Sequence, residues 1–349
     1  MTRAIDVVTA ELLARPRRWL VTGAAGFVGS HLVEHLLGLG QQVVGLDNFS
    51  TGHARNLDSV RAQVGEAAWA RFTLVAADLC TPGACRSACE GVQHVLHQAA
   101  LGSVPRSILD PAATFAANVE GFMRVLEASR AAACDSLVYA SSSSVYGDHP
   151  ALPKREPELG RPLSPYAASK RCDEVLAAAW AHCYGLRITG LRYFNVVGPR
   201  QDPAGAYAAV IPAWLAALAH GRRPVLFGDG ETSRDFCPVA NVVQANLLAA
   251  VAPPGAADER DPVFNVALGR QTTLNQLFEI LRDGMAALGA PCAALTPVYE
   301  DFRPGDIRHS LADIERARVQ LGYDPRIALR EALRATIGWF WADLRTRAA

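Results

Sequence analysis

Short apolar runs recur along the first two thirds of the chain, and longer segments with helical spacing separate them. The segments 29–37, 112–132 and 165–184 carry that helical spacing. Uninterrupted apolar strands that alternate with helices predict a parallel sheet covered on both faces, which is an α/β fold of the doubly wound kind. Such a fold binds its ligand at the carboxyl ends of the strands. The expected strands are Arg18–Thr22, Val43–Asp47, Phe72–Ala76, Val92–Leu96, Ser136–Ala140 and Leu186–Leu191.

The character of the chain changes near Pro199, where loops rich in proline and glycine begin to separate shorter helices. We therefore expect residues 1–197 to form the sheet-containing domain. Residues 198–349 are expected to form mainly a smaller α/β domain that covers the substrate. Val263–Val266 again looks like a buried strand, so the segment 236–266 is expected to return to the first sheet.

The amino-acid composition narrows the kinds of partner that this chain is expected to bind. The 349 residues are 50% apolar and 19% charged, with 34 Lys and Arg against 34 Asp and Glu. This balance gives no reason to expect a nucleic acid, so an anionic ligand would be met by a few placed arginines. No apolar run is long enough for a membrane span, and Asp6, Glu11 and Arg15 argue against a signal peptide. Eight cysteines without a CxxC pair indicate reduced thiols and a cytoplasmic location.

A glycine-rich turn follows the first expected strand and precedes a helix. Gly23, Gly26 and Gly29 are spaced GxxGxxG, and Phe27 and Val28 lie within the same turn. Such glycines allow a tight turn, a close approach of backbone to a pyrophosphate, and close packing of helix on strand. The helix N-terminus adds unpaired N–H groups and a positive dipole end. The turn therefore predicts a dinucleotide site.

Residues at the ends of the next strands are candidates for the rest of that site. Asp47 ends the second strand, where a carboxylate binds both ribose hydroxyls of NAD and repels the 2′-phosphate of NADP. We therefore expect NAD. Asn48 is adjacent, Asp78 and Leu79 follow the third strand, and Gln98, Ala99 and Ala100 follow the fourth, although each of these later groups could also be ordinary loop.

Tyr166 and Lys170 stand four residues apart on an expected helix, so both project from one face. A free phenol has a pKa near 10, and its use as a base at neutral pH requires roughly 4 kcal/mol of preferential stabilisation of the phenolate. A neighbouring ammonium together with a nicotinamide cation can supply this in a dry cleft. Ser142, at the end of the fifth strand, can hydrogen-bond the reacting hydroxyl. The arrangement predicts proton removal from an alcohol while hydride leaves the same carbon.

These motifs resemble the extended short-chain dehydrogenase/reductase superfamily, whose first domain is a Rossmann domain. The resemblance rests on Thr22–Gly29, Ser141–Gly147 and Tyr166-x-x-x-Lys170. The segments 192–195, 230–235 and 303–306 resemble its NAD-dependent sugar-nucleotide epimerase branch. The segments 47–53 and 101–106 are typical of bacterial UDP-N-acetylglucosamine 4-epimerases that serve surface polysaccharide biosynthesis.

The resemblance implies roles for individual residues. Ser142, Tyr166 and Lys170 would be the catalytic triad, because Ser142 stands five residues before the closing Gly147. Tyr193 would lie at the cofactor. Asn195 would contact the diphosphate, Arg234 and Arg303 would neutralise it, and Asp306 would accept a bond from the ribose. Ser103, Ser143 and Gln201 are candidates for hydrogen bonds to an acetamido group, and a homodimer is the implied assembly.

The resemblance also favours one reaction and one substrate. Related dehydratases carry an Asp-Glu pair after the triad residue, whereas Ser143 and Ser144 stand here. Ser310, the fourth residue after Asp306, occupies a position that is tyrosine in enzymes for plain hexoses, so a larger acetamido sugar should fit. The predicted activity interconverts UDP-GlcNAc and UDP-GalNAc. Open alternatives are a UDP-glucose or uronate 4-epimerase, a net dehydrogenase, and a catalytically idle nucleotide-sugar sensor.

Two histidine patterns suggest metal sites less convincingly. His31 to His35 fits the HxxEH pattern of zinc proteases, but it lies in the helix that follows the phosphate-binding turn. His94 and His97 are three residues apart on a strand and should face opposite sides of the sheet. We expect no metal.

Overall fold

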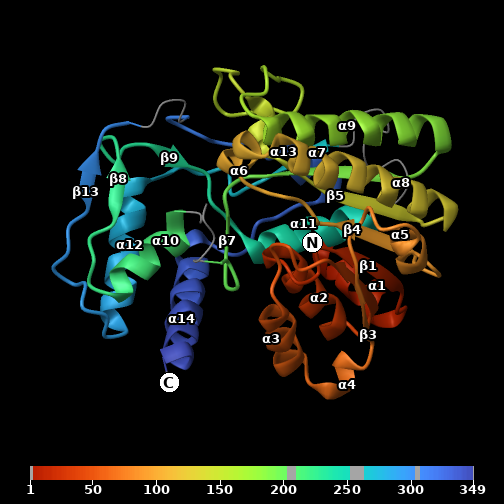
Figure 1. Ribbon diagram of the computed structural model, residues 1–349, viewed down its shortest axis with the longest axis horizontal. Helices are drawn as coiled ribbons and strands as arrows, with labels where there is room; N and C mark the ends of the chain where they lie inside the picture. Colours follow the sequence, from red (N-terminus) through yellow and green to blue (C-terminus); the bar gives the residue numbers. More distant parts are fainter. Residues whose placement is uncertain (1–2, 203–209, 252–262, 303–306, 349) are drawn as a thin grey trace.

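A seven-stranded parallel sheet runs through the computed structural model, which describes residues 3–202, 210–251, 263–302 and 307–348 (Figure 1). The strand order is β11-β6-β5-β4-β1-β2-β3, so the chain reverses its direction of growth between β1 and β4. Every expected strand is present. The strands are β1 (Arg18–Thr22), β2 (Gln42–Asp47), β3 (Phe72–Ala76), β4 (His94–His97), β5 (Ser136–Ser142), β6 (Ile188–Tyr193) and β11 (Val263–Val266).

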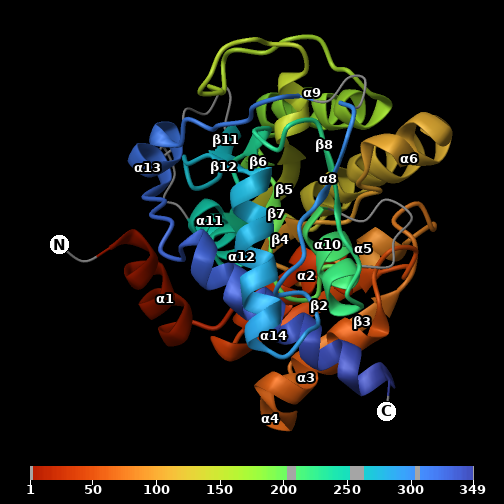
Figure 2. The same cartoon turned by 90° about the vertical axis from the view of Figure 1, so that its left-hand side faces the viewer.

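Helices cover both faces of this sheet, which confirms the doubly wound α/β fold. On one face lie α1 (Ala4–Ala14), α2 (Phe27–Gly38) and α11 (Val239–Val251), and α1 lies beside α11 (Figures 1 and 2). On the other face lie α5 (Ala84–Ala88), α8 (Gly121–Ala131) and α9 (Pro165–Tyr184). Successive side chains of β1 point to opposite faces of the sheet. Val21 packs in the first layer and Leu20 in the second.

β11 adds an edge strand to the sheet and pairs in parallel with β6. Phe264 and Val266 on β11 are buried in the core that contains α2 and α11. A separate core, away from the two faces of the sheet, joins α10 (Val210–Ala219), α12 (Leu274–Ala287) and α14 (Leu329–Ala348) around Leu226 of β8 (Val225–Phe227). The remaining short strands are β7 (Val196–Val197), β9 (Ser233–Arg234), β10 (Cys237–Pro238), β12 (Thr272–Thr273) and β13 (Val298–Glu300), and α13 spans Glu315–Leu321.

The helix expected over 112–132 is interrupted. It consists of α7 (Pro111–Phe115), a π-helical turn over Ala116–Glu120, and α8. Asn118 in this turn is fully buried; its Oδ1 accepts from the N–H of Leu101 at 2.7 Å and its Nδ2 donates to Ser169 Oγ at 3.0 Å. The extra residue of the turn thus aims an amide at α9 and at the loop after β4. Apolar periodicity carries no sign of such a local change.

Further short helices complete the description. These are α3 (Ala54–Val64), α4 (Glu66–Trp69), α6 (Val104–Leu109) and the 3₁₀ turn η2 (Ser143–Tyr146). The N-terminal helix α1 was not expected, yet Leu12 is fully buried and Asp6 pairs with Arg326 at 2.8 Å. None of the described helices is long and apolar enough to cross a membrane.

Candidate active site

A cavity of about 470 Å³ opens at the carboxyl ends of the central strands, on both sides of the point where the strand order reverses. This is where a doubly wound sheet binds its ligand. All the residues expected to bind the cofactor line it: Gly23, Gly26, Phe27, Val28, Gly29, Asp47, Asn48, Asp78, Leu79, Gln98, Ala99, Ala100, Tyr166, Lys170 and Tyr193. Ser142, Asn195 and Gln201 line the same cavity.

The glycine turn has the geometry of a phosphate cradle. Gly23 has φ +67°, and a Cβ placed there would lie 2.8 Å from the backbone N of Ala99. A Cβ on Gly29 would lie only 1.9 Å from the carbonyl oxygen of Gly23. Gly26 caps α2 without a side-chain hydrogen bond, which leaves the first N–H groups of the helix facing the cavity. These residues fit a dinucleotide pyrophosphate.

Asp47 is held in place by two backbone donors. Its Oδ2 accepts from the N–H of Ala25 at 2.8 Å, and its Oδ1 accepts from the N–H of Phe49 at 2.7 Å. The side chain is 7% exposed and still borders the cavity. Asn48 Nδ2 donates to Asp78 Oδ2, which ties the ends of β2 and β3 together. Ribose hydroxyls can therefore meet a carboxylate whose direction is already fixed.

Tyr166 and Lys170 stand on the first turns of α9. Ser164 caps this helix by accepting from the N–H of Ala167 at 3.1 Å, and Pro165 occupies its first position. Tyr166 is half-buried at the cavity, whereas Lys170 is almost fully buried behind it. Ser142 ends β5 and pairs in register with Tyr193 of β6. Its hydroxyl already accepts from the N–H of Ser144 at 3.2 Å and retains a proton to donate.

A ring of three side chains at the floor of the cavity was not foreseen. Asn246 Nδ2 donates to Tyr193 Oη at 2.8 Å, Tyr193 Oη donates to Gln98 Oε1 at 3.0 Å, and Gln98 Nε2 donates to Asn246 Oδ1 at 3.1 Å. Burial raises the pKa of Tyr193 well above its usual range, so this phenol stays protonated. Asn246 comes from α11, which is distant in sequence, and only the fold brings it here.

His94 and His97 face opposite sides of the sheet, as expected. His94 contacts Ser136, and its ring lies against the tilted ring of Trp19 within one layer. His97 stacks on Phe122 in the other layer, and its Nδ1 lies 2.8 Å from Thr22 Oγ1. That hydroxyl accepts from the backbone N–H groups of residues 98 and 99, so its own proton goes to His97 Nδ1. The imidazole is therefore neutral.

The other described candidates for substrate binding are not among the residues that line the cavity. Ser103 caps α6 by accepting from the N–H of Arg106, and Ser143 begins η2. Arg234 Nη1 donates to the carbonyl of Ser233 at 3.0 Å, and the N–H of Ser310 donates to that same carbonyl at 3.1 Å. Arg234 lies on β9, and Ser310 is hydrogen-bonded to the same strand, so the two residues lie close together. Arg303 and Asp306 lie outside the described residues.

The HxxEH-like segment anchors a turn. His31 Nε2 donates to the carbonyl of Pro199 at 3.0 Å, and its Nδ1 accepts from Arg200 at 2.7 Å. Glu34 pairs with Arg200 at 2.6 Å, and Arg200 is only 4% exposed with φ +67°. These contacts fix the residue before Gln201, which lines the cavity. Across the described ranges no group of three or more His, Cys, Asp and Glu side chains is placed to hold a metal.

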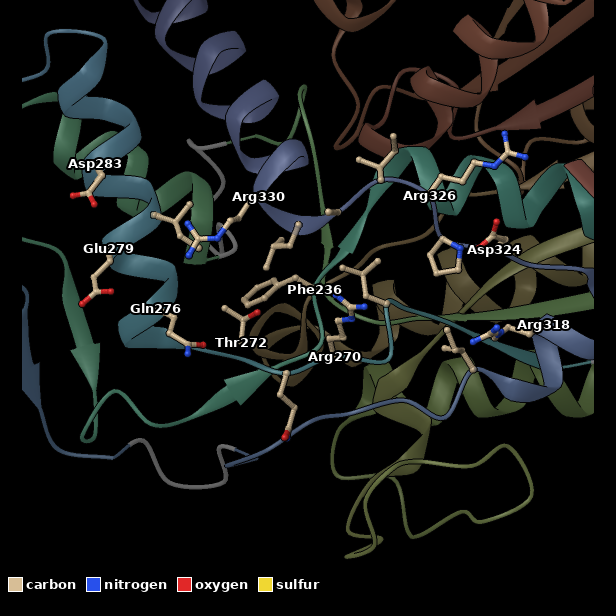
Figure 3. A pocket seen from close by; sticks show the side chains of 18 residues that line it. Phe236, Arg270, Thr272, Gln276, Glu279, Asp283, Arg318, Asp324, Arg326 and Arg330 are labelled. Atoms are coloured by element: carbon tan, nitrogen blue, oxygen red, sulfur yellow. The ribbon is translucent and has the colours of Figure 1, made fainter. Parts of the chain in front are cut away.

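A larger cavity of about 840 Å³ lies away from these residues, between α12, the start of α14 and α13 (Figure 3). Its charged side chains are of both signs, with Arg270, Arg318, Arg326 and Arg330 as well as Glu279, Asp283 and Asp324 in its lining. None of the residues singled out from the sequence lines it. Size alone therefore does not locate the chemistry of this protein.

The fold and the smaller cavity define an α/β enzyme that binds a dinucleotide. A model of the NAD dependent epimerase/dehydratase family matches residues 19–267. The UDP-glucose 4-epimerase of Mycolicibacterium smegmatis is 39% identical over 325 residues, which are 93% of this chain and 98% of that protein. The chain belongs to the NAD dependent epimerase/dehydratase family, as the motifs predicted, and its cofactor is NAD.

Solved structures agree with this assignment. The UDP-N-acetylglucosamine 4-epimerase of Methanobrevibacter ruminantium, solved with UDP-N-acetylmuramic acid, is 37% identical with a TM-score of 0.84, covering 94% of this chain and 99% of that one. The UDP-glucose 4-epimerase of Thermus thermophilus, solved with NAD, is 32% identical with a TM-score of 0.78, covering 93% and 99%. The similarity therefore spans nearly the full length of each chain.

Proposed function

We propose that this NAD-dependent epimerase interconverts UDP-GlcNAc and UDP-GalNAc through a transient 4-keto sugar. One observation carries the proposal: Ser142, Tyr166 and Lys170 line the same cavity as the glycine turn and Asp47. The candidate base and the candidate dinucleotide site therefore lie in the same cavity. The comparisons support a UDP-sugar 4-epimerase, and the choice of sugar rests on the residues discussed below.

The chemistry follows from what these side chains can do. The Tyr166 phenolate takes the proton from the C4 hydroxyl, while Lys170 stabilises the phenolate and Ser142 donates a hydrogen bond to the sugar oxygen. The α2 N-terminus and Asp47 would hold NAD, which would supply the hydride acceptor for C4 and the hydride donor for either face of the 4-keto sugar. Tyr166 then gives its proton back. There is no net change of redox state.

The small side chain of Ser310 and an unpaired acceptor on Gln201 favour the acetamido sugar. Ser310 is small, and its backbone lies against the strand of Arg234, the side chain proposed to contact the phosphates. Gln201 lines the cavity, with Nε2 donating to the carbonyl of Val196 at 3.3 Å. Its buried Oε1 has no protein partner among the described residues and can accept from an acetamido N–H. Ser103 and Ser143 are further candidates for this group.

Tyr166→Phe tests the enzymatic role directly. The variant should lose turnover by about 10²–10⁴-fold while it still binds NAD, because only the base is removed. Full turnover by the variant would contradict the proposed mechanism.

Survival of the biological role in Tyr166→Phe, without turnover, would favour the nucleotide-sugar sensor. Steady accumulation of NADH with the wild-type protein would instead identify a net dehydrogenase, and product analysis with UDP-glucose and UDP-GlcNAcA separates the alternative epimerases.

We also propose that two copies associate through α6, α7 and α9. Large apolar side chains are exposed there, including Ile108 at 61%, Leu109 at 74% and Val175 at 58%. A second copy would remove this surface from water. Sedimentation should give twice the chain mass, and Leu109→Glu should shift the protein towards the monomer.

All eight cysteines are free thiols, which supports a reducing compartment such as the cytoplasm.

A further inference from the structure

A buried ion pair stands directly behind the candidate base. Lys170 Nζ lies 3.1 Å from Asp173 Oδ2, one helical turn along α9, and the two side chains are 2% and 1% exposed. Lys170 borders the cavity, whereas Asp173 does not. The proposed reaction assigns a task to Lys170 and none to Asp173. Burial of a carboxylate here is costly, so its presence beside the ammonium calls for an explanation.

The second carboxylate oxygen of Asp173 has no hydrogen bond within the described structure that would explain its burial. Its Oδ1 is buried and makes no hydrogen bond to any described residue. Lys170 is the one cation within the described surroundings that forms an ion pair with Asp173. Burial raises the pKa of Asp173 to about 6, against the opposing pull of Lys170. The carboxylate is therefore charged at neutral pH and changes its charge under mildly acidic conditions.

The other charged groups around this pair are already paired, neutral or partly exposed to solvent. On α9, Glu174 is paired with Arg192 of β6 and with Arg171. From β4, His97 is neutral, since burial and the charge of Lys170 lower its pKa to about 3. Tyr139 of β5 is a buried phenol. The charged side chains of the helices packed on α9 are exposed or half-buried: Arg106, Asp110, Glu120, Arg124, Glu127 and Arg130.

We propose that Asp173 is a positioning residue that acts through Lys170: it fixes the ammonium on the inner face of α9 and offsets part of its charge at Tyr166. A carboxylate that accepts from Nζ limits the directions in which the ammonium can point. It also subtracts from the positive potential that favours the phenolate. Asp173 therefore sets the pH at which Tyr166 becomes a base. This inference rests on the proposed function of Tyr166 and Lys170.

The test compares Tyr166 ionisation in the NAD-loaded wild type and in Asp173→Asn. Asparagine keeps the shape and an oxygen acceptor for Lys170 but removes the charge. Phenolate absorbance is titrated without substrate in both proteins. The curve of the same protein carrying Tyr166→Phe is subtracted from each, which isolates the absorbance of Tyr166. The midpoint in Asp173→Asn should fall by about one pH unit, because a single negative charge a few ångströms away is lost. The acidic limb of the pH–rate profile should move by the same amount.

Asp6→Asn is the matched control, because Asp6 is half-exposed and paired with Arg326. It should leave the midpoint unchanged. A midpoint in Asp173→Asn that stays in place or rises would overturn the proposal. If that variant does not fold, Asp173→Ala carries the same expectation. Because the titration needs no sugar, a wild type without epimerase activity would refute the function, whereas an active enzyme with an unmoved midpoint would refute only the role of Asp173.

Discussion

Glu174 and Arg192 form a two-pronged ion pair inside the protein, with Nε to Oε1 at 2.8 Å and Nη2 to Oε2 at 2.9 Å. Their side chains are 3% and 1% exposed. Glu174 also accepts from the hydroxyl of Ser141, the residue before Ser142, and Arg192 precedes Tyr193. This pair therefore joins α9, β5 and β6 immediately behind the site, and it fixes the positions of Tyr166 and Ser142 relative to each other.

Arg192→Met should lower the free energy of unfolding by about 3–5 kcal/mol, because it leaves a buried carboxylate with an incomplete set of partners. Denaturant unfolding measures the change. The double variant Glu174→Leu/Arg192→Met should lose less than the sum of the single variants, since their effects are coupled. Glu66→Gln is the control, because Glu66 pairs with Arg61 at the surface. If this control destabilised the protein as much as Arg192→Met, the buried pair would not be what holds these elements together.

The sheet and the glycine turn were predictable because local patterns encode them. Apolar runs locate the strands, and a turn in which Gly29 must approach Gly23 leaves a spacing of glycines in the sequence. The buried polar partners were not predictable. Asp173, Glu174 and Asn246 sit in helices whose sequences give no sign of which side chain they meet. Their contacts arise only when segments far apart in the chain pack together.

Gly29→Ala should abolish NAD binding and destabilise the fold. The added methyl group would lie 1.9 Å from the carbonyl oxygen of Gly23, so the phosphate-binding turn has to open. Gly38→Ala is a matched control at the other end of the same helix, where a Cβ meets nothing within 4 Å. That change should leave NAD binding as it is. Calorimetric titration with NAD compares the two, and equal affinities would contradict the role of the turn.

Ser310→Tyr should reduce turnover of UDP-GlcNAc far more than turnover of UDP-glucose. A bulky ring in a fitted pocket typically costs about 1–3 kcal/mol, and the acetamido group needs the space that the ring would fill. The measurement is kcat/KM for both substrates. Ser310→Ala, which keeps the pocket open, should preserve the wild-type preference. Equal losses on the two substrates would contradict the placement of Ser310 at the sugar.

His97 should make the protein less stable in acid. Burial, with a smaller effect from the charge of Lys170, lowers its pKa from 6.5 to about 3. Between these values the unfolded chain binds a proton that the folded protein excludes, so this contribution to stability is lost as the pH falls. The free energy of unfolding of the wild type should fall by about 1.4 kcal/mol per pH unit more than that of His97→Asn between pH 6 and 4. His182→Asn, at an exposed histidine, should follow the wild type.

The most direct test of the central claim is proton NMR of the purified protein with UDP-GlcNAc and no added electron acceptor. The proposed cycle returns the hydride to the sugar that gave it, so UDP-GalNAc should appear until the two sugars reach equilibrium. No NADH should accumulate during the conversion. An unchanged UDP-GlcNAc spectrum, from protein that is shown to carry NAD, would contradict the account.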